Sequence, residues 1–194
     1  MRFRRMISVA AVLMTVLLMT IAATGCQQIS YGTLINSQDE LEKVMADASL
    51  NFQYPGYLGE AAENSEYQYV AVNDTEQNTY NGYKIYHFGS PFYVSVTAYA
   101  GESDALMSDE ESRTEYLQEL ESERGTITVY SGKGHEDALY LIGCVNIGGN
   151  HYEIRVTNDE EMDENSKYVH AIYADNEYFP AALDTIVKVV ESIQ

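Results

Sequence analysis

An alternation of apolar side chains with polar or aromatic ones runs through this sequence and limits what it can fold into. It is clearest over residues 92–99, where Phe92, Val94, Val96 and Ala98 alternate with Tyr93, Ser95, Thr97 and Tyr99. A period of two, rich in β-branched and aromatic residues, is typical of strands with one buried face. Similar runs predict strands over residues 67–72, 83–88, 126–130, 139–145 and 151–157, with 168–174 as a further candidate.

The strands over 139–145 and 151–157 are separated by residues 146–150, which are rich in asparagine and glycine. A short link of this composition predicts a hairpin. In its second strand Tyr152, Ile154 and Val156 alternate with His151, Glu153, Arg155 and Thr157. We therefore expect the first set to face the core and the second set to face water.

Helical spacing of apolar residues predicts a helix near each end of this region. Leu41, Val44, Met45 and Ala48 form one apolar stripe near the start, and Leu183, Ile186, Val187 and Val190 form another near the end. Pro180 suits the first turn of the later helix. These elements indicate an α+β fold, an antiparallel sheet of about six strands with the N- and C-terminal helices packed on one face.

A third helix is expected between the strands. Ser108 can cap it, Glu111 completes a capping box, and Gly125 provides a left-handed stop. Its narrow apolar stripe consists of Tyr116, Leu117 and Leu120. We expect it to lie against the sheet with most of its surface in water.

The first residues form an export signal. Three arginines among residues 1–5 precede an apolar run over 6–23, as in a secretory signal peptide. Small residues lead to Gly25 and Cys26, and this segment resembles the bacterial lipoprotein signal, although Ala23 stands where that family usually has leucine. The resemblance implies cleavage after Gly25 and a diacylglyceryl lipid on Cys26. An uncleaved membrane span over 6–23 is the alternative, and it exports the rest of the chain equally.

The predicted organisation is therefore a signal peptide over 1–25, a lipidated Cys26 with a tether over 26–37, and one globular domain over 38–194. The expected location is the extracytoplasmic face of the cell membrane, held by the lipid. The net charge is −19, and removing residues 1–25 removes three arginines and no acids. This acidity excludes a nucleic-acid partner and docking on anionic headgroups.

Chemistry-bearing residues are sparse by sequence. His87, His135, His151 and His170 show no metal-ligand spacing, so no metal site and no cofactor are predicted. Cys144, the one cysteine left once Cys26 is lipidated, lies in an apolar run and is expected to be a buried small hydrophobe. The acidic run over 159–164 lacks the EF-hand register, so a solvated loop is favoured over a calcium site.

Tyrosine is abundant, with seventeen copies. Tyr67, Tyr69, Tyr93 and Tyr99 are expected opposite the apolar strand positions, where they would form an exposed aromatic platform for peptides, glycans or proteins. The alternative is that tyrosine is simply a good strand former on half-buried faces.

Three segments, over residues 51–58, 148–154 and 189–193, resemble uncharacterised extracytoplasmic domains of Gram-positive lipoproteins and of the outer regions of anti-sigma factors. That resemblance implies sensing or binding without catalysis. The expected function is a membrane-anchored, non-catalytic binding or sensory module for a protein or an envelope component. The alternatives are a carrier of a hydrophobic ligand in a sheet–helix cavity and an envelope hydrolase that uses scattered carboxylates.

Overall fold

The computed structural model describes residues 32–60, 65–74, 79–89, 91–107, 114–133, 139–158 and 178–194. The expected signal peptide, Gly25 and Cys26 lie outside these residues, as do the acidic run over 159–164 and the candidate strand over 168–174. Among the helices that are described, none is long and apolar enough to cross a membrane.

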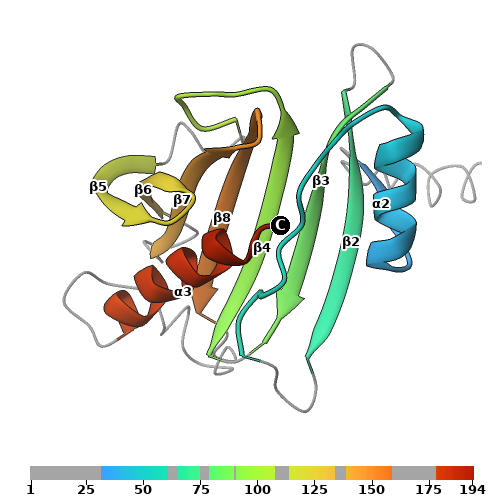
Figure 1. The fold of residues 1–194 in the computed structure, drawn as a ribbon. Coiled ribbons are helices and arrows are strands. Elements are labelled where there is room, and N and C mark those ends of the chain that lie inside the picture. Colours follow the sequence, from blue (N-terminus) through green and yellow to red (C-terminus); the bar gives the residue numbers. More distant parts are fainter. Residues whose placement is uncertain are drawn as a thin grey trace, which may run out of the picture. The chain divides into compact units, whose positions relative to one another are not determined.

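The described residues form one antiparallel sheet of eight strands (Figure 1). The strands are β1 (Gly32–Ile35), β2 (Glu66–Asp74), β3 (Thr79–Phe88), β4 (Phe92–Ala100), β5 (Thr114–Ser122), β6 (Gly125–Lys133), β7 (Leu139–Ile147) and β8 (Asn150–Asn158). Their order across the sheet is β1-β2-β3-β4-β8-β7-β6-β5. After β4 the chain therefore goes to the far edge and returns strand by strand, so that β8 pairs with β4.

Two helices are described, α2 (Gln38–Asp47) and α3 (Tyr178–Ser192). The Ser37 side chain caps α2 by accepting a hydrogen bond from the Glu40 N–H at 3.2 Å. α2 packs against β1, β2 and β3, and α3 packs against β5, β7 and β8. The residues that pack against both helices lie on one face of the sheet, which we call the helix face.

The core lies on the helix face. Its fully buried members from the sheet include Ile85, Val96 and Ile154, which occupy paired positions on β3, β4 and β8. α2 contributes Leu41 and Met45, and α3 contributes Ala182, Ile186, Val189 and Val190. The residues of both helices and of the sheet belong to one continuous apolar cluster, which supplies most of the hydrophobic stabilisation of the fold.

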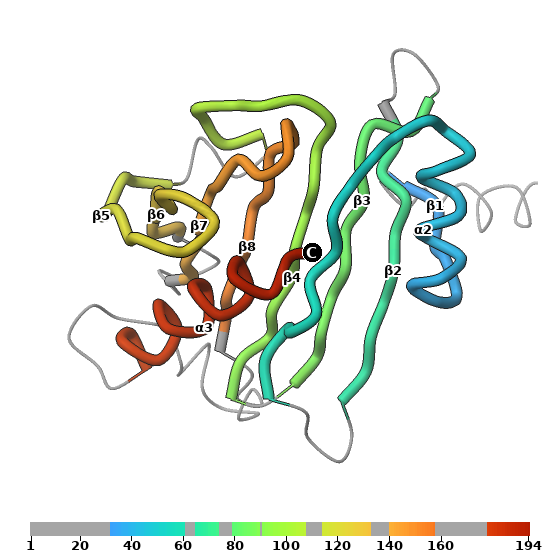
Figure 2. The backbone as a smooth tube through the Cα atoms, in the orientation of Figure 1, coloured from blue at the N-terminus to red at the C-terminus, as the bar shows by residue number. Residues whose placement is uncertain are grey.

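Between the two helices the chain that follows α2 crosses the helix face (Figure 2). The backbone of Gln53 lies over two buried tyrosines: its carbonyl accepts hydrogen bonds from Tyr83 at 2.8 Å and Tyr152 at 3.2 Å. Tyr54 then exchanges two backbone hydrogen bonds with Gln194 at the end of α3. Residues 53 and 54 are thus fixed to the sheet by hydrogen bonds from the two tyrosines and to the last residue of the chain by backbone hydrogen bonds.

A smaller apolar cluster lies on the opposite face, over β6, β7 and the segment after β4. It contains Leu106, Tyr140, Ile142 and Cys144, with Tyr130 packed against it. Residues 101–107, which we call the crossing segment, begin the passage from β4 to the far edge. The opposite face is therefore partly covered, although no described helix packs there.

The helix expected after Ser108 is wrong over its described part, because Thr114–Ser122 form strand β5. Residue 108 and residue 111 lie outside the described residues. β5 and β6 form a hairpin in which Ser122 pairs with Gly125, so Gly125 (φ +130°) closes a strand turn. A register shift between Tyr116 and Gln118 lets Leu117 and Leu120, three residues apart, both pack on the core. This bulge mimics the spacing of a helix.

Two further expectations need correction, the number of strands and the extent of the tether. The sheet has eight strands, not about six. One of the additional strands is β1, which lies within the expected tether and pairs Ile35 with Tyr69 of β2. The other is β5. The coarse α+β class holds, and the hairpin expected over 139–157 is confirmed as β7 and β8.

Candidate functional site

Four polar or sulfur-bearing side chains form a compact group on the opposite face, at the β7–β8 hairpin. Gly148 and Gly149 turn the chain with positive φ angles of 62° and 83°. The resulting register places Cys144 opposite Glu153 and Asn146 opposite His151. Side chains two residues apart on a strand share a face. The hairpin therefore gathers these four residues, which we call the polar cluster.

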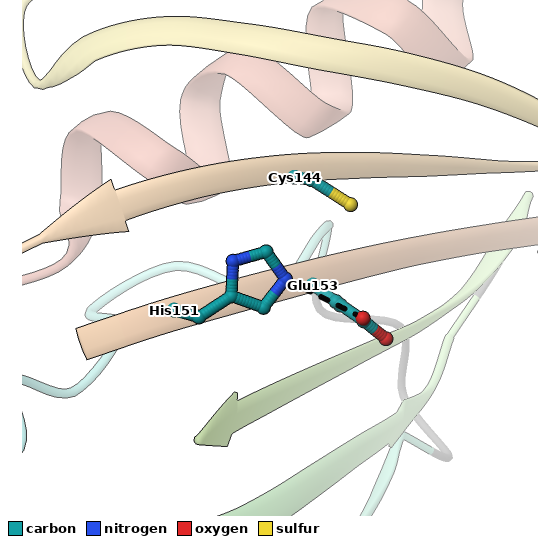
Figure 3. A group of neighbouring side chains, drawn as sticks. All are labelled: Cys144, His151 and Glu153. Carbon is teal, nitrogen blue, oxygen red and sulfur yellow. Dashed lines mark ion pairs between the residues drawn. The ribbon is translucent and has the colours of Figure 1, made fainter. Parts of the chain in front are cut away.

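Three members of the polar cluster converge on one point. One ligand atom each from Cys144, His151 and Glu153 lies within 4.8 Å of the other two (Figure 3). The His151 Nε2 atom is 3.4 Å from Glu153 Oε1. A thiol, an imidazole and a carboxyl group are thus within reach of one small ligand.

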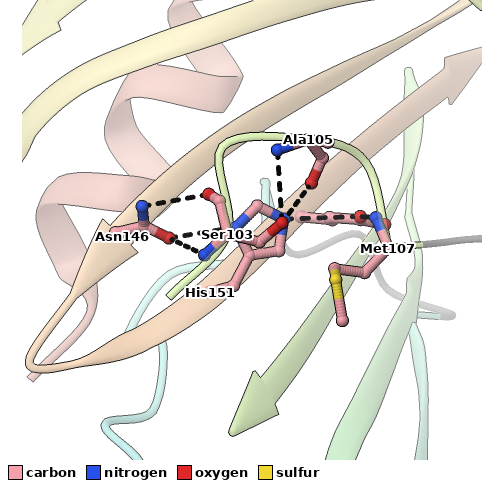
Figure 4. Close-up of polar contacts among 6 residues, drawn as sticks. Ser103, Ala105, Met107, Asn146 and His151 are labelled. Carbon is pink, nitrogen blue, oxygen red and sulfur yellow. Dashed lines mark hydrogen bonds and ion pairs between the residues drawn. The ribbon is translucent and has the colours of Figure 1, made fainter. Parts of the chain in front are cut away.

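The fourth member, Asn146, fixes the tautomer of His151. The Asn146 amide donates from Nδ2 to the Ser103 carbonyl at 3.0 Å, and its Oδ1 accepts from the Ser103 N–H at 3.2 Å (Figure 4). This pair of bonds identifies Oδ1 as the atom that faces His151 Nδ1, 3.1 Å away. Since Oδ1 can only accept, Nδ1 carries the proton.

The crossing segment covers the polar cluster and is hydrogen-bonded to it. The Met107 N–H donates to Glu153 Oε1 at 2.5 Å, while Leu106 packs with Cys144 in the smaller apolar cluster. Ser103 Oγ closes a tight turn by bonding to both the N–H and the carbonyl of Ala105. The crossing segment is therefore joined to the polar cluster at Ser103 and at Met107 (Figure 4).

The polar cluster is buried, which corrects the expectation that this side of β8 faces water. His151 is 1 % exposed, Glu153 4 % and Cys144 7 %. On β4, the neighbouring strand, Tyr99 stacks beside the His151 ring at a centroid distance of 6.3 Å. Burial, and secondarily the charge of Glu153, raise the pKa of the Cys144 thiol. A thiol with a raised pKa is a poor nucleophile, so its environment disfavours thiolate catalysis at Cys144.

One atom of the polar cluster is unsatisfied. His151 Nε2 is buried and makes no hydrogen bond with acceptable geometry. With the proton on Nδ1, Nε2 presents a lone pair to the Cys144 sulfur and the Glu153 carboxylate. Buried polar atoms are nearly always paired, so such an atom indicates a missing proton or a missing ligand.

The predicted tyrosine platform is divided between the two faces. Tyr67 and Tyr69 pair with His87 and Ile85 and lie on the helix face, stacked with ring centroids 6.5 Å apart. Alternation along β4 places Tyr93 and Tyr99 on the opposite face. Tyr67 and Tyr93 are exposed, at 46 % and 39 %. The structure therefore brings two of the four residues together and does not form one platform.

Among the other predicted histidines, His87 is buried on the helix face, and residues 135 and 170 lie outside the described residues. His87 Nδ1 is 2.6 Å from the Leu58 carbonyl, and Tyr67 stacks on its ring at 4.7 Å. It packs β3 against the chain around Leu58, and its Nε2 atom, like that of His151, is buried without a hydrogen-bond partner. Among the described residues, His87 does not belong to any cluster of side chains that could hold a metal ion.

Comparison with protein-family models, with curated proteins and with solved structures found no match to this chain.

Sequence reasoning missed the polar cluster because it searched for ligands at helical or loop spacing. The signal was present in the predicted hairpin. A two-residue glycine turn at 148–149 fixes the register, and counting outward from it pairs Asn146 with His151 and Cys144 with Glu153. The spacing of ligands across a hairpin, and not along one segment, defines this site.

Proposed function

We propose that this chain is a lipid-anchored, extracytoplasmic binding or sensory module without catalytic activity. The anchor is a diacylglyceryl group on Cys26, exposed after cleavage at Gly25. The arginine-rich start, the apolar run and the small residues before Cys26 support it. Two acyl chains give stable anchoring where one gives only reversible binding.

The observation that carries the binding function is the convergence of ligand atoms from Cys144, His151 and Glu153 within 4.8 Å of one another, with the His151 Nε2 atom unsatisfied. A small ligand that accepts electron pairs would satisfy it. The proposed ligand site is therefore the polar cluster.

The proposed output is the crossing segment. It is hydrogen-bonded to Asn146 and Glu153 on one side, and its Met107 side chain is 51 % exposed on the other. Occupancy of the polar cluster would change how firmly Ser103 and Met107 are held. A protein or envelope partner that contacts the crossing segment would sense that change.

Mass spectrometry of protein extracted from membranes tests the anchor. We expect a mature chain that begins at Cys26 and carries the diacylglyceryl mass. Cys26→Ser should retain residues 1–25, whereas Cys144→Ser, the matched control, should be processed normally. Wild-type protein that keeps Met1 and a bare Cys26 thiol would disprove the lipid anchor.

Site-specific photocrosslinking on intact cells tests the output. A crosslinker at Met107 should capture a partner whose yield falls in the Asn146→Ala background. Leu34, which is 70 % exposed on the edge strand β1, provides the control position. Equal yields from the two positions, or no effect of Asn146→Ala, would refute a partner at the crossing segment.

A further inference from the structure

We propose that the polar cluster is a binding site for one zinc-class divalent cation, with Cys144 Sγ, His151 Nε2 and a Glu153 carboxylate oxygen as its protein ligands. This inference rests on the proposed function, since it names the ligand of the same site. The ligand atoms lie within 4.8 Å of one another and come from two paired strands.

The hydrogen bonds around His151 prepare it as a ligand. Asn146 Oδ1 holds the proton on Nδ1, so the lone pair of Nε2 is directed at Cys144 and Glu153. Histidine ligands of metals commonly donate their other N–H to an oxygen acceptor in this manner. Asn146 is itself held by two bonds to the Ser103 backbone, which makes it a positioning residue.

The distances suit a small tetrahedral ion. With metal–nitrogen and metal–oxygen bonds of about 2.0–2.1 Å, adjacent tetrahedral ligands lie about 3.4 Å apart. The observed separation between His151 Nε2 and Glu153 Oε1 is 3.4 Å. The Cys144 sulfur lies within 4.8 Å of both atoms, and a metal–sulfur bond of about 2.3 Å would bring it to about 3.5 Å from each in an occupied tetrahedral site.

The ligand chemistry selects the class of ion. A thiolate with an imidazole favours zinc and its borderline or soft neighbours, whereas calcium and magnesium require more oxygen atoms. Three protein ligands leave a fourth position for water or a ligand from a partner. The strongly acidic chain, with net charge −19, raises the local concentration of cations.

An occupied site would also fasten the crossing segment. Glu153 accepts from the Met107 N–H, and Asn146 is bonded to Ser103. A cation that fixes Glu153 and His151 therefore restricts both attachment points of the segment. Binding of the ion is the signal that is sensed, and the crossing segment is the surface whose mobility changes in response.

The test uses the full chain, extracted from membranes in detergent and stripped with a chelator. Titration with Co²⁺ alone should give one equivalent of binding, intense visible bands of a tetrahedral ion and an ultraviolet sulfur-to-cobalt charge-transfer band. Zn²⁺ should displace Co²⁺ stoichiometrically, and Mg²⁺ or Ca²⁺ in large excess should not. The wild-type spectrum is informative by itself, whatever the stability of any variant.

Variants assign the ligands. Cys144→Ser should abolish the charge-transfer band, and Glu153→Gln and His151→Gln should each weaken Co²⁺ binding more than about 100-fold. Asn146→Ala should weaken it about 10- to 100-fold while the tetrahedral bands remain, as expected for a positioning residue. His87→Gln is the matched control, because His87 is equally buried, at 1 % exposed, and lies outside the cluster.

Absence of the charge-transfer band in wild-type protein, or its persistence in Cys144→Ser, would overturn the proposal. The polar cluster would then be a buried group of paired side chains without a metal. These outcomes leave the lipid on Cys26 and the crosslinking at Met107 unaffected. Conversely, tight cobalt binding by a chain without a lipid would refute the anchor and keep the metal site.

Discussion

The two faces of strand β8 differ in how completely the polar atoms of their buried side chains are satisfied. On the helix face Tyr152 and Ile154 of β8 are fully buried, and the tyrosine hydroxyl is satisfied by the Gln53 backbone. On the opposite face their neighbours His151 and Glu153 are buried almost as completely, yet His151 Nε2 lacks a hydrogen-bond partner. Strand β8 thus contributes core residues whose polar atoms are satisfied to one face, and a buried group with an unsatisfied atom to the other.

The difference teaches where stability and binding reside. Apolar burial contributes about 25 cal/mol per Å² and needs no partner atom of a particular kind. A buried imidazole and carboxylate are costly to desolvate, so they contribute little to stability by themselves. We therefore expect substitutions on the helix face to weaken folding and substitutions in the polar cluster to weaken binding.

The largest expected effect is Ile154→Ala on the helix face. It removes three buried carbon atoms from the centre of the main apolar cluster and should lower the free energy of unfolding by about 3 kcal/mol. Urea denaturation measures it, with Leu34→Ala, at a 70 % exposed position, as the near-neutral control. If both variants lose the same small amount, the helix face is not the stabilising core.

Gly143→Ala should come next, because Gly143 is where α3 approaches the sheet. An added Cβ would lie 2.4 Å from Ile186 Cγ2 and 3.0 Å from Ile127 Cγ2. Overpacking of this kind costs about 1–3 kcal/mol. The double variant with Ile186→Ala removes the closest methyl group, so its unfolding free energy should exceed that expected from adding the two single losses. Simple additivity would show that α3 is not closely packed there.

Alkaline pH should weaken the helix face through its buried tyrosines. Burial is the main cause that raises the pKa of Tyr83, and it also raises the pKa of Tyr152. The folded state then keeps protons that the unfolded state releases above pH 10. Stability is fully present below about pH 10 and falls as the pH rises further, by about 1.4 kcal/mol per pH unit for each tyrosine that stays protonated.

Urea denaturation between pH 8 and 11 measures this loss. Tyr83→Phe removes one titrating group and should make the decline shallower, at the cost of the hydrogen bond to Gln53. Tyr93→Phe, at a 39 % exposed position on the opposite face, is the control. An identical decline in all three proteins would assign it to other groups.

The smallest change in stability is expected for the double variant His151→Leu with Glu153→Leu. Removing both partners of a buried pair avoids their desolvation, so unfolding of the chelator-treated protein should shift by no more than about 1 kcal/mol, or increase. Glu153→Leu alone should be clearly less stable than the double variant, because it leaves the His151 imidazole buried without its carboxylate partner, whereas both variants lose the acceptor of the Met107 N–H. A large loss in the double variant would make the polar cluster a structural element.

Much of the fold was predictable where the pattern is local. The β7–β8 hairpin follows from two apolar runs and an asparagine- and glycine-rich link, and both helices follow from their apolar stripes. β5 was not predictable, because its bulge places Leu117 and Leu120 at helical spacing. On β2 the expected face was wrong: Tyr69 packs on the helix face, although Val70 and Val72 are the more apolar set.

The sequence by itself determined the apolar and acidic composition, the arginine-rich start before Cys26, and the hairpin over residues 139–157 that carries Cys144, Asn146, His151 and Glu153. Only the tertiary structure decided that this group is buried, because its cover comes from the crossing segment and from β4, which are distant in the chain. Alternation states that a side chain lies on one of two faces. What lies above each face depends on contacts between remote segments, and those contacts convert an ordinary polar strand face into a candidate site.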